Sequence, residues 1–358
     1  MKVSVITAFY KGNKYMPSYV KCMLANAGNM QRCGHELEVI VVNDSPNEQV
    51  VLVNDSPDGQ QVTFMSEGNK DAISDANGSD RASGIGLSSI EIRDEVERLI
   101  TVINQPQNTG IHGARVNGLK HATGDYIMFL DQDDLLADDA LLQHVNCILE
   151  WQSKLDEINK NMSQELQRTE TIQKMYNPVS VSNASLEQAD GTALSWYRTD
   201  YHKNQIGKLS TYIKVGNQII SPGQCLIPRQ FVPRIWTERI CKENGSDDYY
   251  LWLVMLALRH HFILVDEPLY THKYTGANIS ADTTNTDVST YEFADFLRDA
   301  DYFSQRDIDK LLRMNEYKAE FRASNKAKKI LLSLRNLDIF LANVFYKIKT
   351  KTPVGFNR

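Results

Sequence analysis

The sequence lacks the features that would place it in several simpler protein classes. Its five cysteines include no C-x-x-C pair and no regular spacing, which argues against a zinc site or a disulfide framework and favours a reducing compartment. No uncharged apolar run reaches the roughly 18 residues of a membrane span, and the apolar run Val3 to Ala8 is too short for the core of a signal peptide. We therefore expect a cytoplasmic globular protein.

The chain also lacks an excess of basic residues. It has 39 Lys and Arg against 45 Asp and Glu, a net charge of −6, so a polyanion would be repelled and no nucleic-acid partner is expected. The charge is unevenly distributed, because residues 313–358 hold eleven basic and three acidic residues, a net charge of +8. The rest of the chain therefore carries −14.

Apolar, β-branched runs alternate with helical patterns in the N-terminal part of the sequence. The predicted strands are Val3 to Ala8, Glu38 to Val42, Leu99 to Ile103 and Tyr126 to Leu130, and the predicted helices lie near Tyr15 to Ala27 and His112 to His121. Strand, helix and strand in this order predict an α/β fold with a parallel sheet flanked by helices.

A short internal duplication follows the second predicted strand. The segment VVNDSPNEQ at Val41 is echoed by LVNDSPDGQ at Leu52, so Asp44 and Asp55 compete for one role at the end of a strand. Beyond it, residues 58–98 are rich in Gly, Ser, Asn and Asp over much of their length, a composition that predicts a surface insertion.

Two acidic clusters stand at positions where carboxylates can do chemistry. Asp131-Gln132-Asp133-Asp134 directly follows a predicted strand, and ligands of α/β sheets bind beyond the carboxyl ends of strands. One or two carboxylates together with substrate phosphates commonly hold Mg²⁺ or Mn²⁺. Asp247-Asp248 opens an apolar helix. For both clusters the alternative is that Asp only caps a helix.

Six segments occur in the order that is typical of one enzyme family. They are VSVITAFYKG, EVIVVNDS, NTGIHGARVNGLKHATGDYIMFLDQDD, ISPGQCLIPR, SDDYYLWL and PLYTHKY. In these segments, from about Met1 to Ser280, the chain resembles the inverting nucleotide-sugar glycosyltransferases of glycosyltransferase family 2. The resemblance implies the GT-A fold, a Rossmann-like, mostly parallel sheet flanked by helices.

The resemblance also implies a domain organisation. Residues 1–284 would form the GT-A catalytic domain, with the surface insertion at 58–98 and a largely helical insertion at 150–215 in the acceptor half. Residues 285–358 would form a helical, basic and amphipathic C-terminal extension.

Roles are implied residue by residue. The nucleotide-sugar-binding residues would be Ala8 and Tyr10 beside the nucleoside, Asp44 at the base with Asp55 as its alternative, Gly110, Arg115, and Asp131 near the ribose. Asp133 would hold Mn²⁺ or Mg²⁺ on the diphosphate. Asp248 would be the general base that deprotonates the acceptor hydroxyl, with Asp247 as the alternative.

The sequence departs from the family pattern at several positions. Ala8-Phe9 replaces the usual Pro-Thr, and Val116 replaces the Asn beside the helix arginine. Thr275 stands where a histidine commonly follows the last strand, so nearby His272 is a candidate metal ligand or a structural residue. The Q-x-x-R-W signature of processive synthases is absent, which favours transfer of a single sugar.

Two further segments are assigned by resemblance with a structural alternative beside each. Ser221 to Arg229 would lie near the donor or the acceptor, and without the family it is a loop with a short strand. The aromatic residues Tyr249, Tyr250 and Trp252 either stack on sugars or belong to the core.

The basic tail has a helical pattern of its own. Ile330, Leu334, Leu337, Leu341, Val344 and Ile348 recur at intervals of four and three among many lysines, which predicts an amphipathic cationic helix. Such a helix either contacts a membrane surface through residues 326–351, packs on the catalytic domain, or packs on a second subunit in a homo-oligomer.

We therefore expect a metal-dependent, inverting glycosyltransferase that moves one sugar from a nucleotide-sugar, with UDP as the expected nucleotide. The acceptor would be a saccharide or a lipid-linked saccharide in surface glycan biosynthesis, and the enzyme would be cytoplasmic, at the inner face of the plasma membrane if the tail binds there. One alternative is a catalytically silent sugar-nucleotide or glycan-binding scaffold. Another is a nucleotidyltransferase, which predicts Gly-rich, basic contacts near the N-terminus, where the sequence offers Lys11-Gly12.

Overall fold

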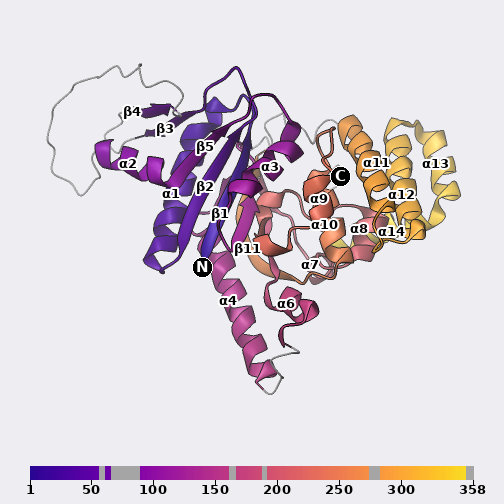
Figure 1. Ribbon diagram of the computed structural model, residues 1–358. Coiled ribbons are helices and arrows are strands. Elements are labelled where there is room, and N and C mark those ends of the chain that lie inside the picture. The colour runs from indigo at the N-terminus through magenta and orange to yellow at the C-terminus, as the bar shows by residue number, and fades with distance from the viewer. Residues whose placement is uncertain (56–60, 66–88, 161–166, 188–191, 274–282, 352–358) are drawn as a thin grey trace.

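The computed structural model describes residues 1–55, 61–65, 89–160, 167–187, 192–273 and 283–351. A mixed sheet runs through the molecule with helices on both faces (Figure 1). Its strands follow the order β5-β2-β1-β6-β10-β8-β11-β7, and β9 pairs with β8. The strands are β1 Lys2–Phe9, β2 Glu36–Asn43, β5 Ile100–Asn104, β6 Tyr126–Phe129, β7 Leu135–Leu136, β8 Val179–Glu187, β9 Ala193–Ser195, β10 Cys225–Pro228 and β11 Phe262–Lys273.

The N-terminal half of the sheet is the parallel α/β unit that the sequence predicts. β1 pairs in parallel with β2 and with β6, and β2 pairs in parallel with β5. The apolar runs predicted as strands all lie in or overlap these four. Every residue of β6 is buried, as expected for a strand covered on both faces.

The second half of the sheet departs from a mostly parallel arrangement. β10 pairs antiparallel with both β6 and β8, whereas β8 and β11 are parallel to each other. β8 and β9 lie within residues 150–215, the segment expected to be largely helical, so this segment adds sheet as well as helix. β8 begins with alternating Val and Ser (Val179 to Ser182), a period-two pattern that is typical of a strand, so the expectation of a largely helical segment missed this signal.

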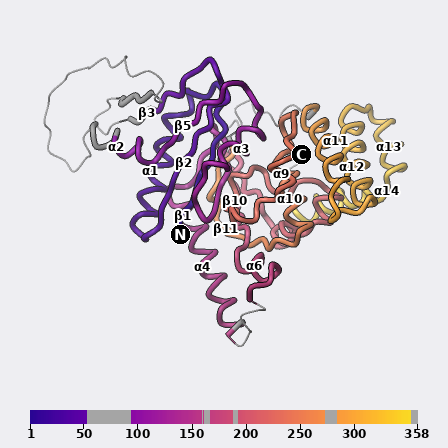
Figure 2. Tube along the Cα trace, in the orientation of Figure 1, coloured from indigo at the N-terminus to yellow at the C-terminus, as the bar shows by residue number. Residues whose placement is uncertain are grey.

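Helices cover the sheet and continue beyond it toward the C-terminus (Figure 2). They are α1 Met16–Arg32, α2 Ser89–Leu99, α3 Gly110–His121, α4 Ala140–Asn159, α6 Glu170–Tyr176, α7 Asp200–Lys203, α8 Leu209–Val215, α9 Arg234–Glu238, α10 Asp247–Ala257, α11 Thr283–Arg298, α12 Gln305–Ala323, α13 Lys326–Arg335 and α14 Leu337–Thr350. Within the described ranges, none of these helices combines the length and the apolar character that a membrane span needs.

Close packing of α3 on the sheet depends on a glycine. A Cβ added at Gly118 would lie 2.4 Å from Ile6 Cγ2 and 3.0 Å from Val42 Cγ2. Both of these side chains are buried and β-branched, so they have little freedom to move aside. Gly118 therefore lets α3 lie directly on β1 and β2, and this fixes the position of Arg115, one turn earlier on the same helix.

The duplicated segment is divided between two sheets. Asp44 directly follows β2 of the main sheet, whereas Asp55 ends β3 (Val51–Asp55), which pairs only with β4 (Gln61–Met65) in a separate two-stranded sheet of the described chain. Most of the insertion expected at 58–98 lies outside the described residues. Helix α2 and the hairpin strand β4 are its described parts.

The C-terminal helices pack directly on the rest of the protein. α12 contacts α8 and α11, and α14 contacts α7 and α8. The division between a catalytic domain ending at residue 284 and an extension starting at 285 stays a prediction. The structure shows that both sides of this boundary contribute to one cavity.

Candidate active site

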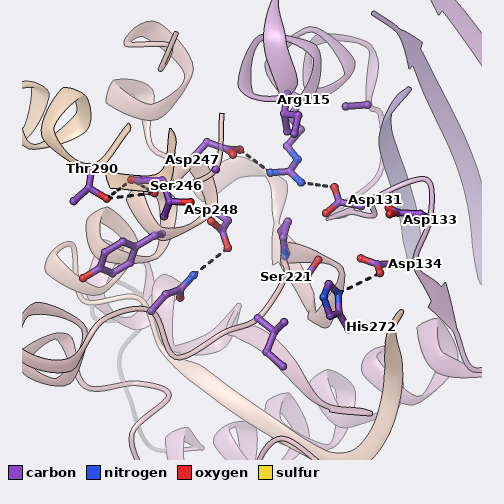
Figure 3. Close-up of a pocket in the computed structure, with 18 of the residues that line it drawn as sticks. Arg115, Asp131, Asp133, Asp134, Ser221, Ser246, Asp247, Asp248, His272 and Thr290 are labelled. Atoms are coloured by element: carbon purple, nitrogen blue, oxygen red, sulfur yellow. Dashed lines mark hydrogen bonds and ion pairs between the residues drawn. The ribbon is translucent and has the colours of Figure 1, made fainter. Parts of the chain in front are cut away.

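A cavity of about 430 Å³ lies beyond the carboxyl ends of β1 and β6. Its walls come from the loop after β1, the turn after β6, the start of α10, and the C-terminal helices α11 and α12. Figure 3 shows the two acidic clusters of the sequence facing this space from opposite sides, with Arg115 between them. The prediction that the two clusters meet across one cleft is confirmed.

The acidic turn is tied to the N-terminal loop by the residue between its first two aspartates. The Gln132 side chain accepts a hydrogen bond from Tyr10 N and donates one to Tyr10 O, both at 3.0 Å. Gly12 makes room for this contact, because a Cβ there would lie 2.0 Å from Gln132 Oε1. The first acidic cluster and the tyrosine expected beside the nucleoside are therefore held together.

The three carboxylates of this turn have different surroundings. Asp134 is buried and accepts a hydrogen bond from the Tyr270 hydroxyl, and His272 Nδ1 lies 3.4 Å from its Oδ1. Asp133 is partly exposed at the cavity wall. Burial, together with the negative charges of Asp134 and Asp131, raises the pKa of Asp133 to about 6. This concentration of negative charge favours a cation at the turn.

Arg115 joins the two acidic clusters. One guanidinium nitrogen lies 2.5 Å from Asp131 Oδ1 and another lies 2.7 Å from Asp247 Oδ2. The Arg115 and Asp247 side chains are each only 5% exposed, so this ion pair is shielded from solvent and breaking it would be costly. The Asp131 side chain is 37% exposed. The structure shows Arg115 paired with two carboxylates at the cavity wall. Its contact with a nucleotide-sugar, which the family resemblance implies, stays a prediction.

Asp247 and Asp248 face different environments although they are adjacent. Asp247 is buried, and its backbone oxygen accepts a hydrogen bond from Trp236 Nε1. Burial alone would raise the pKa of Asp247, but the charges of Arg115 and His112 lower it below the usual value. Asp248 is partly exposed in the cavity and accepts a hydrogen bond from Asn217 Nδ2 at 3.0 Å. Of the two, Asp248 is the carboxylate that a ligand can reach.

Most of the predicted site residues line the cavity. These are Ala8, Tyr10, Arg115, Asp131, Asp133, Asp247, Asp248 and His272. Asp44 and Gly110, although described, are not among the lining residues. Asp44 is buried and accepts hydrogen bonds from Thr109 N and Gln105 Nε2 at 2.7 and 2.8 Å, so it organises the approach to α3. A contact between Asp44 and a nucleotide base stays a prediction.

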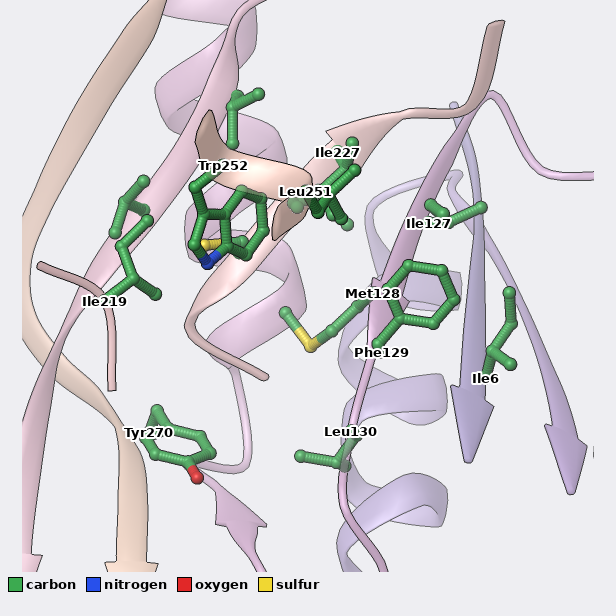
Figure 4. Close-up of a cluster of buried hydrophobic side chains, with 14 of the residues drawn as sticks. Ile6, Ile127, Met128, Phe129, Leu130, Ile219, Ile227, Leu251, Trp252 and Tyr270 are labelled. Atoms are coloured by element: carbon green, nitrogen blue, oxygen red, sulfur yellow. The ribbon is translucent and has the colours of Figure 1, made fainter. Parts of the chain in front are cut away.

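The aromatic residues of α10 belong mainly to the core. Trp252 and Tyr250 are fully buried, and Figure 4 shows Trp252 among apolar side chains such as Leu251 and Ile219. Tyr249 lines the cavity, but its hydroxyl donates to Tyr212 O. Ser221 also lines the cavity, as the resemblance implies for its segment.

Several lining residues were not predicted from the sequence. Lys318 and Arg322 of α12 and Asp287 of α11 form one wall. Arg322 lies 2.5 Å from Asp287 Oδ2, and Lys318 Nζ donates to Val215 O at 2.5 Å. Burial and the charges of Arg322 and Lys347 lower the pKa of Lys318 to about 7. The four-residue spacing of Lys318 and Arg322 places them on one helix face, but nothing in the sequence shows which way that face points.

The acidic turn fits a divalent cation that shares its coordination with a substrate. Asp131 and Asp133 offer the oxygen ligands that Mg²⁺ and Mn²⁺ prefer. Among the described residues no group of three or more His, Cys, Asp or Glu side chains is arranged to hold a metal ion. Phosphate oxygens of a bound ligand would therefore have to complete the coordination, as the sequence predicts for a metal-bound diphosphate.

Part of the chain is similar to known proteins. Residues 88–152, which include α3, β6 and the acidic turn, match the family model described as Glycosyl transferase family 2. An uncharacterized glycosyltransferase of Haemophilus influenzae is 40% identical over 65 residues, or 17% of this chain. The match spans only 26% of the length of that relative.

The fold is also found among solved structures. S. aureus TarS 1-349, in complex with UDP-GlcNAc, aligns with a TM-score of 0.50 at 14% identity, covering 98% of this chain and 82% of that one. A mannosyltransferase from Pyrobaculum calidifontis, in complex with GDP-Man and Mn²⁺, aligns over 98% of this chain and 88% of that chain at 14% identity and a TM-score of 0.44. The family model thus matches the part of the chain that holds α3, β6 and the acidic turn, and the TarS structure shares the fold.

Proposed function

We propose that this protein is a metal-dependent, inverting glycosyltransferase that moves a single sugar from a nucleotide-sugar to a saccharide or lipid-linked saccharide. The observation that carries the proposal is the meeting of Asp131 and Asp133 with Asp248 in one cavity, linked through Arg115 and Asp247. One cluster suits a diphosphate with its cation, and the other offers a carboxylate to an incoming hydroxyl. The expected donor is a UDP-sugar, and the complex of TarS with UDP-GlcNAc is consistent with it.

The two sides of the cavity would have different roles, and the side with Asp131 and Asp133 would bind the donor. Asp133, with Asp131 beside it, would hold Mn²⁺ or Mg²⁺, which when bound offsets the charge of the departing diphosphate. Tyr10 is fixed to the same turn through Gln132 and would border the nucleoside. Asp131 is held in place by Arg115. The donor therefore meets side chains that are already oriented.

Asp248 would act as the general base. As the acceptor oxygen bonds to the anomeric carbon, the bond from that carbon to the diphosphate oxygen breaks, and the hydroxyl proton passes to Asp248. The hydrogen bond from Asn217 orients the carboxylate. Attack from the face opposite the leaving group inverts the configuration in a single displacement, and no protein nucleophile is needed.

The acceptor would enter on the side of α11 and α12. In Figure 3, Thr290 of α11 lies beyond Ser246 and Asp248, on the side away from Asp133. Thr290 is fixed there by the 3.3 Å contact of its hydroxyl with Ser246 Oγ. We place the reaction in the cytoplasm, at the inner face of the plasma membrane when the acceptor is lipid-linked.

The test is nucleotide release from a panel of nucleotide-sugars in the presence of Mn²⁺, with and without saccharide acceptors. Asp133→Asn should abolish release by weakening metal and diphosphate binding. Asp248→Asn should leave donor binding intact but reduce transfer by about 100-fold or more. Asp138→Asn and Glu243→Gln are matched controls, because both residues are exposed and absent from the cavity wall.

The products separate this proposal from its alternatives. A glycosyltransferase releases nucleoside diphosphate, whereas a nucleotidyltransferase releases pyrophosphate. A silent scaffold binds the donor and releases neither product. Normal turnover by Asp248→Asn would show that the base is a different residue.

A further inference from the structure

The last two helices are fastened to the protein by one face. Leu332 of α13 and Ile339 and Tyr346 of α14 are buried, and α14 packs on α7 and α8. The Tyr346 hydroxyl donates to Gln218 Oε1 at 2.6 Å, and the Thr199 hydroxyl donates to Lys349 O at 2.8 Å. The face of α13 and α14 that carries these buried residues, the inner face, therefore packs on the rest of the chain.

The outer face of these helices is apolar and uncovered. It is defined by eight large side chains that are between 37% and 69% exposed, namely Ile330, Leu331, Leu334, Leu337, Leu341, Val344, Phe345 and Ile348. Fourteen large hydrophobic side chains are exposed in the described residues, so more than half of them gather on this one face. A concentration of this kind marks an interaction surface.

Basic residues accompany the outer face. Residues 326–351 contain seven Lys and Arg and a single acidic residue, Asp338, which pairs with Arg313. Six of the seven basic side chains are exposed, namely Lys326, Lys328, Arg335, Lys347, Lys349 and Lys351. The surface therefore combines apolar side chains with positive charge, the pairing that suits the interface of an anionic bilayer.

We propose that the outer face of α13 and α14 docks onto the surface of an anionic lipid bilayer, with its apolar side chains in the interface and its basic side chains at the lipid headgroups. A second copy of the chain fits the face less well. A two-fold interface brings the same patch against itself, so the net charge of +6 carried by residues 326–351 would face an equal charge. An anionic lipid surface supplies the opposite charge.

The proposed face lies close to the acceptor side of the cavity. α13 packs on α12, and α12 also supplies Met314, Asn315, Lys318 and Arg322 to the cavity wall. In Figure 1, α13 lies at the edge of the molecule farthest from β3 and β4, and α14 lies next to α8. Docking there would bring the membrane within one helix layer of the cavity.

The test is cosedimentation of the full chain with phosphatidylcholine vesicles and with vesicles of phosphatidylcholine and phosphatidylglycerol. The wild type should bind the mixed vesicles, more weakly at high salt, and bind phosphatidylcholine alone poorly. The variant L334S/L341S/I348S should lose at least about tenfold in affinity, because each of these side chains favours an apolar environment. Ile158→Ser is the matched control, since Ile158 on α4 is 76% exposed and distant in sequence.

A second variant tests the charge separately. K326Q/R335Q/K349Q keeps the apolar face and should weaken binding to the mixed vesicles by about tenfold or more, while binding to phosphatidylcholine stays low. Circular dichroism and the unfolding temperature should match the wild type for both variants, because the altered side chains are exposed.

Two results would overturn the proposal. One is unchanged vesicle binding by L334S/L341S/I348S. The other is a wild type that does not bind vesicles but forms a dimer, together with loss of that dimer in this variant. This result would assign the face to a second copy of the chain. Donor and acceptor are absent from the assay, so its failure would leave the proposed transferase activity standing.

Discussion

Asp247 and Asp248 show how neighbouring residues of the same type divide into a structural and a reactive role. Successive residues of a helix point about 100° apart, so the two side chains differ in exposure: Asp247 is buried and Asp248 is partly exposed, although both line the cavity. Asp247 faces Arg115, whereas Asp248 faces the open space and Asn217. The same substitution should therefore have different effects at the two positions.

Asp247→Asn should lower the free energy of unfolding by about 3 kcal/mol, because it removes one charge from a buried ion pair and leaves Arg115 with Asp131 alone. Asp248→Asn should change it by less than about 1 kcal/mol, since Asp248 is partly exposed. Urea denaturation of the two variants beside the wild type measures both values. Equal losses would show that Arg115 does not depend on Asp247.

Among the secondary-structure elements, helix α12 shows that the C-terminal part of the chain contributes residues to the candidate site. Its buried residues Ile308, Leu311 and Met314 pack against the protein, and one turn further on Lys318 enters the cavity wall. Charging a buried amine is unfavourable, which is the main reason why the pKa of Lys318 falls to about 7. A pH dependence of stability follows from this shift.

Lys318→Met should stabilise the protein most at and below about pH 7. The unfolded chain keeps the proton up to about pH 10.5 and the folded chain releases it near pH 7, so the charged lysine destabilises the fold fully below pH 7 and progressively less as the pH rises toward 10.5. The gain of about 1–3 kcal/mol at pH 7, reduced by the lost hydrogen bond to Val215 O, should shrink by pH 10. Denaturation curves of the wild type and of this variant at several pH values measure it.

The elements that the sequence predicts are those with local signals. β1, β2 and β6 are short apolar runs, and the turn residues after them are polar, so both the strands and the position of the acidic turn are predictable. β10 is only four residues long, and its antiparallel insertion between β6 and β8 depends on partners far along the chain. The sequence therefore predicts a mostly parallel sheet flanked by helices, but not which strands of that sheet are antiparallel.

The sequence predicts the carboxylates of the candidate site, but it does not predict the contacts that hold these carboxylates in place. Asp131, Asp133 and Asp248 stand at the ends of recognisable elements. The link through Arg115 requires α3 to lie between the turn after β6 and the start of α10, which no local pattern encodes. The periodicity of the tail likewise predicts an amphipathic helix, but the inward face is decided by Gln218 and the helices α7 and α8.

At the level of the whole molecule, the cavity should bind cation and nucleotide together. Because no group of three or more His, Cys, Asp or Glu side chains in the described residues is arranged to hold a metal ion, Mn²⁺ alone should raise the unfolding temperature little, as should UDP alone. Both together should raise it by several degrees, since a ligand present at about 100 times its Kd stabilises by about 2.7 kcal/mol. Thermal unfolding followed by fluorescence measures this. Asp133→Asn should lose the combined effect and Asp138→Asn should keep it.

The doubly paired arginine limits how this molecule can change shape. Spreading the two carboxylate clusters apart would strip a shielded guanidinium of one of its partners, so the turn after β6 and the first turn of α10 must travel as a single rigid unit. Any opening or closing that accompanies turnover then has to occur elsewhere around the rim, and the hinge belongs among elements that Arg115 does not touch.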